Sequence, residues 1–354
     1  MKKHNFSAGP CVLPKSVLDK CSKSILEFNK LGLSLIEISH RSKDFIEVME
    51  KARFLTKELL KIPKGYSILF LQGGASLEFL MVPANLLRHK AAYLKTGTWA
   101  NKAINEAELY GEVNIVGDSS DKNYSYIPKG YNIPKDIDYF HCTSNNTIFG
   151  TQMHEFPEVP SLMVCDMSSD IFSREINISG FDLIYAGAQK NMGPAGTTLV
   201  IVKDEILGKT NRKIPTMLDY QTHIKKDSMF NTPPVFAVYA SMLTLEWLKN
   251  IGGIKEIEKI NRLKSETLYS EIDRNSLFKG ISNKEDRSIM NVTFDTTRKD
   301  VNVIFDQLCQ KTGIYGIKGH RSVGGYRASI YNALSIESVN HLVEIMQDLE
   351  IKMK

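Results

Sequence analysis

The sequence LIYAGAQKNMGPAGTTLVIV, residues 183–202, joins two short apolar runs through a loop of small residues. Apolar runs of this length, rich in Leu, Ile and Val, predict buried strands. The loop between them carries one long charged side chain, Lys190, among residues such as Gly193 and Pro194. Small residues allow another molecule to approach the backbone closely. We therefore predict two strands of a sheet with a candidate site in the loop that joins them.

Further predicted strands and helices lie on both sides of this stretch. Residues 67–71 form an apolar run that leads into glycines 73 and 74 and then into a helical pattern over about 76–87. Residues 162–165 are another apolar run, and it ends on Asp166. Short apolar runs that alternate with amphipathic stretches are typical of α/β proteins, so α/β is the predicted fold class.

A change of pattern after residue 250 indicates a domain boundary. A helical pattern of apolar residues follows Pro234 and stops at Asn250, just before two glycines. We predict a large domain at 11–250 and a smaller α+β domain at 251–354, to which residues 1–10 are assigned. The smaller domain is expected to contain an amphipathic helix, a strand near 289–294, a helix near 301–311, two strands within 314–330 and a last helix after Ser335.

The composition is that of an ordinary globular protein. The chain has 354 residues, 42% apolar and 24% charged, and its length suits two domains. The net charge of +5 is too small for a nucleic-acid-binding surface. No apolar run approaches a membrane span, and the start MKKHNF lacks the apolar segment of a secretory signal. Five scattered cysteines without a C-x-x-C pair predict reduced thiols in a cytoplasmic protein.

Lys190 is a candidate nucleophile. A lysine held partly out of water has a lowered pKa, and its amine can form a Schiff base. The alternative is a solvated lysine in a turn, which describes most single lysines. A flexible charged side chain is an unusual choice in a loop of small apolar residues, and this favours the functional interpretation.

Asp166 is a candidate partner for a cation. It follows four apolar residues, and a carboxylate at the end of a buried strand is costly unless it meets a cation or hydrogen-bond donors. A protonated pyridine nitrogen would be such a partner. The alternative is an aspartate that caps a helix or a turn.

Two further segments suit an aromatic phosphate ligand. The run Gly73-Gly74-Ala75-Ser76 lies between a predicted strand and helix, where free N–H groups can bind phosphate. It is neither a P-loop nor a G-x-G-x-x-G motif, and a simple strand–helix turn explains it equally well. Trp99 could stack on an aromatic ligand, although a core tryptophan is the usual explanation.

Two His-Arg pairs indicate an anion site. They are His40-Arg41 and His320-Arg321, and Arg327 follows the second pair after two glycines. Arginine binds carboxylate and phosphate through two parallel hydrogen bonds, and histidine adds a donor that can titrate. The alternative for each segment is a solvated, positively charged hairpin.

Together these motifs resemble a known family. The similar stretches are 5–10, 39–41, 185–196, 229–234 and 319–333, and they span nearly the whole chain. The chain resembles the phosphoserine aminotransferases, which are class V, fold-type I pyridoxal-phosphate transaminases. The resemblance implies a large domain with a mixed, mostly parallel sheet flanked by helices, and a smaller α+β domain at the C-terminal end.

The resemblance also implies a role for each cofactor-binding residue. Lys190 matches the lysine that forms the Schiff base with pyridoxal phosphate, and Asp166 the carboxylate that faces the pyridine nitrogen. Trp99 matches the stacking aromatic and Thr147 the partner of the phenolic oxygen. The phosphate-binding positions are matched by Ala75, Ser76, Gln189 and, from the neighbouring subunit of a homodimer with shared active sites, Asn231 and Thr232.

The substrate-binding positions match as well. Arg327 corresponds to the residue that holds the substrate α-carboxylate. The pocket for the distal anion is matched by His40, Arg41, His320 and Arg321. Two positions depart from some members: Ser76 replaces an arginine, and Ala8 a serine near the substrate. Both departures concern affinity for cofactor and substrate and leave the chemistry unchanged.

The implied reaction is reversible amino transfer from L-glutamate to 3-phosphohydroxypyruvate, which yields 2-oxoglutarate and O-phosphoserine. The keto precursor of 4-phosphohydroxythreonine, in pyridoxine synthesis, is a further substrate that the resemblance allows. Three alternatives remain: a cysteine desulfurase, a transaminase for small amino acids, and a non-catalytic protein that binds a phosphorylated ligand. No cysteine lies on a loop that suits a desulfurase, since Cys309 falls in a helical pattern. A transaminase for alanine or glycine would not need two His-Arg pairs.

Overall fold

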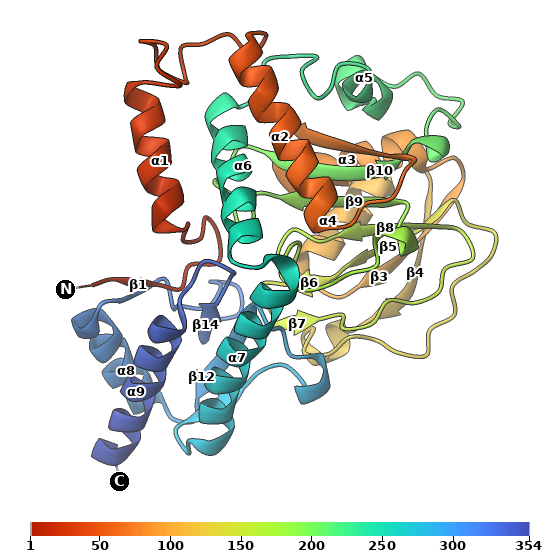
Figure 1. The fold of residues 1–354 in the computed structure, drawn as a ribbon. Helices are drawn as coiled ribbons and strands as arrows, with labels where there is room; N and C mark the ends of the chain where they lie inside the picture. Colours follow the sequence, from red (N-terminus) through yellow and green to blue (C-terminus); the bar gives the residue numbers. More distant parts are fainter. Residues whose placement is uncertain (1, 354) are drawn as a thin grey trace.

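A seven-stranded sheet forms the centre of the larger part of the molecule (Figure 1). The structure is a computed structural model that describes residues 2–353. From one edge to the other the sheet contains β2 (Tyr66–Leu71), β10 (Thr198–Lys203), β9 (Leu183–Gly187), β8 (Leu162–Asp166), β5 (Tyr139–Thr143), β3 (Lys90–Lys95) and β4 (Glu112–Asp118). Strand β10 is antiparallel to both of its neighbours, and the other pairings are parallel.

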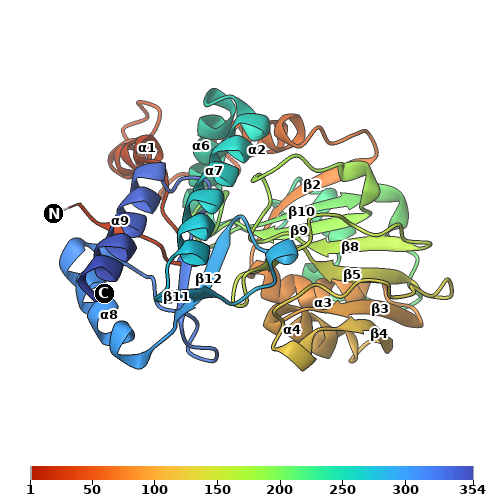
Figure 2. The same cartoon turned by 90° about the horizontal axis from the view of Figure 1, so that it is seen from below.

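Helices cover both faces of this sheet, as Figure 2 shows from below. One face packs against α1 (Lys15–Leu26), α2 (Lys43–Leu59) and α6 (Val235–Asn250), and the other against α3 (Gly74–Leu86), α4 (Thr98–Ala107) and α5 (Tyr220–Ile224). Side chains alternate between the faces: Phe70 belongs to the first core and Leu69 to the second. A sheet buried on both faces explains why its strands are continuous apolar runs in the sequence.

The smaller part of the molecule lies beside the sheet and has its own apolar core (Figure 2). Its antiparallel sheet has the order β11 (Phe278–Gly280), β12 (Asn291–Thr296) and β14 (Tyr326–Ser329). Its helices are α7 (Gly253–Arg274), α8 (Lys299–Thr312) and α9 (Ile336–Met353). Strand β1 (His4–Asn5) pairs in parallel with β13 (Ile314–Tyr315), so the start of the chain packs here. The short hairpin β6 (Asn145–Asn146) and β7 (Thr151–Gln152) follows β5.

The separate cores support two domains. We propose that residues 11–250 form the large domain and 251–354, with 1–10, the small one. Phe6 packs in the core that contains β12, α8 and α9, which supports the assignment of the N-terminal segment. Helix α7 contributes to both cores, because Ile257 packs with the large domain and Leu268 with the small one. This helix therefore fixes the two domains together along its length.

The predicted strands agree closely with β2, β8, β9 and β10, and the predicted helix over 76–87 is α3, which begins at Gly74. The α/β fold class is confirmed. The local patterns of the sequence did not predict β3, β4, β5 or the helices before residue 60. Strand β5 reads YFHCT, and the ring of His141, which is buried beside Tyr185, interrupts its apolar run. Within residues 2–353, no helix is both long enough and apolar enough to cross a membrane.

Lys264 of α7 is a fully buried lysine with an uncommon role in the small domain. Its ammonium donates to the carbonyl oxygens of Ile330 at 2.9 Å, Tyr331 at 2.7 Å and Leu334 at 3.1 Å. Burial lowers the pKa of Lys264 to about 7. The three acceptors use all three N–H groups of the charged form, so they oppose that shift. The lysine thereby holds the segment that connects β14 to α9.

We predict that Lys264→Met destabilises the protein by about 3 kcal/mol, since three buried carbonyls lose the ammonium donor and, within residues 2–353, only that of Tyr331 keeps a second donor, the Leu334 N–H. Urea unfolding of the purified protein measures this change. The control is Lys279→Met, at an exposed lysine of β11, which should shift the free energy of unfolding by less than about 0.5 kcal/mol. Equal effects of the two substitutions would contradict the role given to Lys264.

Candidate active site

A cavity of about 430 Å³ lies at the carboxyl ends of the parallel strands. Loops after β2, β3, β5, β8 and β9 form one wall, and the N-terminal segment and β14 form the other. Ligands of open α/β sheets bind at this edge, because loops from neighbouring parallel strands converge there. The site residues expected from the sequence that line the cavity are Ala75, Ser76, Trp99, Thr147, Asp166, Gln189, Lys190, His320 and Arg327, with Ala8 beside them.

Lys190 lies three residues beyond the end of β9, in the loop that leads to β10. The Ala188 N–H donates to the Thr197 carbonyl at 3.0 Å and closes the base of this loop. Burial lowers the pKa of Lys190 to about 8. The negative charge of Asp166 opposes this shift, and the positive charge of Arg327 adds to it. A substantial fraction of Lys190 is therefore a neutral amine near pH 8, the form that attacks an aldehyde.

Asp166 ends β8, the strand next to β9, and is only 4% exposed. The Ser168 N–H donates to its Oδ1 at 2.9 Å, and the Ser168 hydroxyl accepts from the Gly187 N–H at 3.2 Å. Burial raises the pKa of Asp166, whereas Ser168 and Lys190 lower it. A cation placed in the cavity beside this carboxylate would lower its pKa further and keep it ionised.

The start of α3 forms the third part of the site. Its N-cap residue, Gly73, has a φ of 90°, and Gly74 has a φ of 65°. A side chain at Gly73 would place its Cβ 2.5 Å from the Cβ of Leu77, so only glycine fits there. Within the described residues, no side chain caps this helix. Ala75 and Ser76, in the first turn of this helix, line the cavity, and a helix start without a side-chain cap attracts phosphate.

Trp99, Thr147 and Arg327 are connected by hydrogen bonds across the cavity. The Trp99 Nε1–H donates to the Thr147 hydroxyl at 3.0 Å, and Arg327 donates from Nη1 to the Thr147 carbonyl at 3.0 Å. Nε of Arg327 is buried and has no partner in the part of the chain that the structure describes. Burial lowers the pKa of Arg327. A guanidinium held in this way, with an unused donor, is a ready site for a carboxylate.

His320 lines the cavity beside Arg327, on the loop before β14. Its Nδ1 lies 2.6 Å from the Ser322 hydroxyl. Burial lowers the pKa of His320, and the charges of Arg327 and Arg321 lower it further. A bound anion would have the opposite effect and raise this pKa.

Five of the residues expected from the sequence lie outside the cavity that this chain forms by itself: His40, Arg41, Asn231, Thr232 and Arg321. Arg41, Asn231, Thr232 and Arg321 are exposed, and His40 is half-buried. They lie on connecting segments, before α2, before α6 and before β14.

Several polar residues of the cavity were not anticipated. Ser168, Ser169, Asn145 and Thr143 all line it. Ser168 and Ser169 follow Asp166 directly, and short polar residues after a buried strand that ends in an acid are a local signal that could have marked them. Asn145 and Thr143 give no such signal, because their place depends on how β5 packs beside β8.

Comparison with known proteins agrees with this geometry. Residues 3–342 match the model of the family described as aminotransferase class-V. The phosphoserine aminotransferase of Flavobacterium psychrophilum is 66% identical over 99% of this chain and all of its own length. A solved phosphoserine aminotransferase, studied for radiation damage of its Schiff base, has a TM-score of 0.97 and 45% identity over 99% of both chains. The PLP-bound phosphoserine aminotransferase of Trichomonas vaginalis has a TM-score of 0.93 and 35% identity over 98% of this chain and all of its own.

The chain belongs to the class-V aminotransferase family. Within it, the full-length similarity to the Flavobacterium psychrophilum protein places the chain among the phosphoserine aminotransferases.

We predict that Lys190 of the cofactor-free protein is acetylated by acetic anhydride with a midpoint near pH 8, because only the neutral amine reacts. For an exposed lysine, the midpoint of acetylation lies at about pH 10.4. Asp166→Asn removes the anion that raises this pKa, so the midpoint should move to lower pH. Peptide mass spectrometry across a pH series measures both values.

The control is Asp204→Asn, which follows β10 at the opposite edge of the sheet. This variant should leave the midpoint of Lys190 unchanged. A midpoint above pH 10 in the unmodified protein would refute the electrostatic description of Lys190.

Proposed function

We propose that the protein transfers an amino group reversibly from L-glutamate to 3-phosphohydroxypyruvate and so forms O-phosphoserine and 2-oxoglutarate. One observation carries this proposal. Lys190, whose pKa is lowered, and the buried carboxylate of Asp166 line one cavity from neighbouring strands. The same cavity contains the uncapped start of α3 and the guanidinium of Arg327. A protein that only binds a phosphorylated ligand would not need the pair formed by Lys190 and Asp166.

The cavity fits pyridoxal phosphate, an aromatic aldehyde that carries a phosphate and a ring nitrogen. The uncapped start of α3 suits the phosphate, Asp166 the ring nitrogen and Lys190 the aldehyde carbon. Thr147, whose hydroxyl already accepts from Trp99, suits the phenolic oxygen. When bound, the cofactor supplies a carbon that accepts the amino group and a protonated ring that draws electrons from the substrate α-carbon.

The residues of the chain then perform three tasks. Asp166, ionised and buried, holds a proton on the ring nitrogen. The free Lys190 amine would take the proton from the substrate α-carbon and deliver it to the cofactor's aldehyde carbon, on the far side of the transferred nitrogen. Arg327 holds the α-carboxylate of each substrate in turn, so both halves of the reaction use one orientation. Because one cavity serves the amino donor and the amino acceptor in turn, we expect ping-pong kinetics.

A site for both a γ-carboxylate and a phosphate needs donors that recognise oxyanions in general. His320 provides one such donor in the cavity. We propose that Arg321, which adjoins it, and His40 and Arg41 complete the distal anion site. Nε2 of His40 is buried and has no partner among residues 2–353, which leaves it available to a ligand.

We propose a homodimer in which His40, Arg41, Asn231 and Thr232 complete the cavity of the neighbouring subunit. All four residues lie outside the cavity of their own chain, and Arg41, Asn231 and Thr232 are exposed, which supports this arrangement. Exposed apolar side chains lie close to them in the sequence, among them Leu33, Ile36 and Phe230, which are 51%, 62% and 39% exposed. Apolar side chains clustered in this way are typical of a surface that is covered in the assembly.

The cysteines support a transaminase over a desulfurase. Cys11 is the one nearest to Lys190, and its thiol donates to the Lys190 carbonyl. Burial raises the pKa of Cys11 to about 12, so it is a poor nucleophile at neutral pH. All five cysteines, which fall within the described residues, are free thiols. We propose the cytoplasm as the location, because free thiols persist in a reducing compartment.

We predict that the purified protein with pyridoxal phosphate converts glutamate and 3-phosphohydroxypyruvate, and that Lys190→Ala lowers kcat at least about a thousandfold, since the proton at the α-carbon then has no acceptor. A coupled assay of 2-oxoglutarate formation measures the rate. Borohydride should fix the cofactor to the unmodified protein and to the exposed-lysine control Lys213→Ala, but not to Lys190→Ala. Fixation to Lys190→Ala would exclude Lys190 as the Schiff-base lysine.

Shared active sites can be tested with mixed dimers. Lys190→Ala and Arg41→Ala should each be nearly inactive alone with the phosphorylated substrate. Unfolding and refolding them together in equal amounts should restore about a quarter of the normal activity, because half of the dimers then contain one complete site. No recovery, with mixed dimers shown by native mass spectrometry, would mean that Arg41 serves its own subunit or neither.

A further inference from the structure

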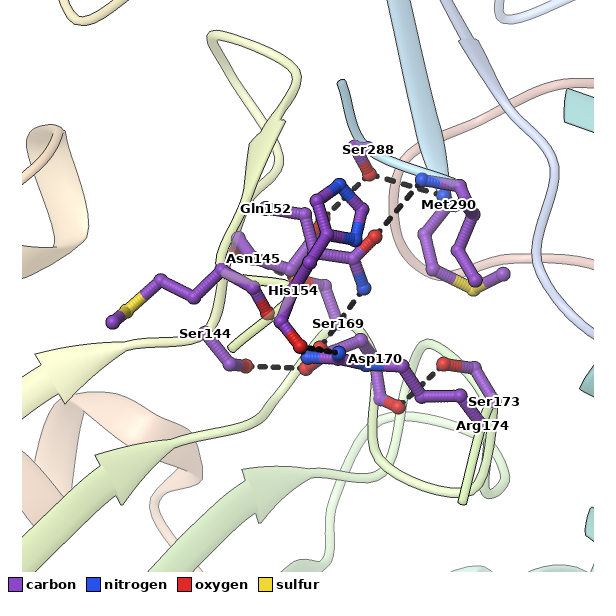
Figure 3. Close-up of polar contacts among 12 residues, drawn as sticks. Ser144, Asn145, Gln152, His154, Ser169, Asp170, Ser173, Arg174, Ser288 and Met290 are labelled. Carbon is purple, nitrogen blue, oxygen red and sulfur yellow. Dashed lines mark hydrogen bonds and ion pairs between the residues drawn. The ribbon is translucent and has the colours of Figure 1, made fainter. Parts of the chain in front are cut away.

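Asn145 connects the cavity to the small domain through its side-chain amide. It lies on β6, just after the strand that ends beside Asp166, and is 2% exposed. Its Nδ2 donates to the Ser169 hydroxyl at 2.7 Å and to Oδ1 of Asn291 at 2.8 Å. Its Oδ1 accepts from the Ser288 hydroxyl (Figure 3). Both donors of the amide are used, and Ser169 belongs to the large domain whereas Ser288 and Asn291 belong to the small one.

Asn291 continues the connection to the strand that carries Arg327. Its Nδ2 donates to the Ser329 hydroxyl at 3.0 Å and to the Tyr331 hydroxyl at 3.1 Å. Asn291 and Ser329 face each other across β12 and β14, and Arg327 is two residues before Ser329 on the same strand. Tyr331 in turn donates to the carbonyl of Ala8, at the mouth of the cavity.

The opposite end of the connection reaches the loop of Lys190. The Ser169 hydroxyl donates to the Asn145 carbonyl at 2.8 Å, and the Ser169 carbonyl accepts from Nδ2 of Asn191 at 3.1 Å. Asn191 directly follows Lys190, and its Oδ1 accepts from the Asn332 N–H of the small domain at 3.0 Å. The hydrogen bonds therefore form a continuous path from the lysine loop to the arginine strand.

A buried carboxylate fixes the hairpin on which Asn145 lies. Asp170, fully buried, accepts from the Ser144 hydroxyl, from Gln152 at 3.1 Å and from Arg174 at 3.1 Å (Figure 3). Gln152 also accepts from the Ile289 N–H of the small domain at 3.0 Å. The strands β6 and β7 are thus held from both domains, which leaves little freedom to absorb the loss of one amide.

We propose that Asn145 and Asn291 act together as positioning residues that set the distance between the Lys190 amine and the Arg327 guanidinium. This proposal rests on the proposed function, in which the substrate joins these two groups. Asn291 is fully buried and lies outside the cavity lining, so when either amide is substituted, the polar groups left on β12 and β14 reach solvent only through a shift of β14 against β6. The shift would weaken the hold of Arg327 on the α-carboxylate that all substrates share, and would leave the cofactor contacts of Asp166 in place.

The test is a double-substitution cycle with Asn145→Ala and Asn291→Ala. Each variant should raise KM about tenfold, for glutamate and for 3-phosphohydroxypyruvate alike, because a contact shared by every substrate is weakened. The visible band of the bound cofactor should stay unchanged, and kcat should change less than about twofold. The double variant should be no worse than the more affected single variant, since both act through one connection.

A second readout does not depend on turnover. Hydrogen–deuterium exchange of the full-length protein without substrate should be faster in Asn291→Ala at the amides of β14, and the exchange of β8 and β9 should be unchanged. The matched control is Asn275→Ala. Asn275 is a buried amide of the small domain that donates to Glu271 and Met346 and accepts from the Leu277 N–H, away from the cavity.

Asn275→Ala should lower the urea midpoint about as much as Asn291→Ala does. It should leave the KM for glutamate and the KM for 3-phosphohydroxypyruvate unchanged. If it raises KM as Asn291→Ala does, or if exchange at β14 does not respond to Asn291→Ala, the positioning role is refuted. A failure of the proposed function would look different: the unsubstituted protein would not convert glutamate, while the exchange experiment would still report on β14.

Discussion

The chemistry of this protein depends on keeping the Lys190 amine out of water next to a buried carboxylate. Burial lowers the pKa of Lys190 and raises that of Asp166, and the charge of each group partly offsets the shift of the other. The sheet makes this possible because β8 and β9 are parallel neighbours, so the carboxylate and the lysine loop leave the same edge. The fold thus supplies a proton acceptor and a fixed negative charge within one cavity, and the other contacts serve to place a substrate between them.

Both domains contribute residues to the cavity, so the domains must be held in a fixed relative position for Lys190 and Arg327 to act on one substrate. The reactive amine belongs to the large domain and the arginine for the substrate carboxylate to the small one. An apolar contact between the domains would tolerate sliding, whereas hydrogen bonds between buried amides fix both distance and direction. The hydrogen-bonded asparagines therefore account for polar side chains that are enclosed at this junction.

Much of the fold and half of the site were predictable from local patterns. The strands β2, β8, β9 and β10 are largely apolar runs. Asp166, which ends β8, and Lys190, three residues beyond β9, line the cavity as expected. The amide connection was not predictable, because Asn145 and Asn291 are far apart in the sequence and no local pattern indicates that they meet. Lys264 would be assigned to the surface by its type. The second subunit's share of the site cannot be derived from one chain by periodicity, and only the resemblance suggested it.

The antiparallel strand β10 imposes a constraint on length. Thr198 pairs with Gly187 on one side and with Leu71 on the other, so the segment 188–197 must begin and end at fixed points of the sheet. One inserted residue would exchange the faces of Leu199 and Val200, which belong to different cores. A change in the length of this segment would therefore displace the Lys190 amine from the edge of the sheet where Asp166 lies.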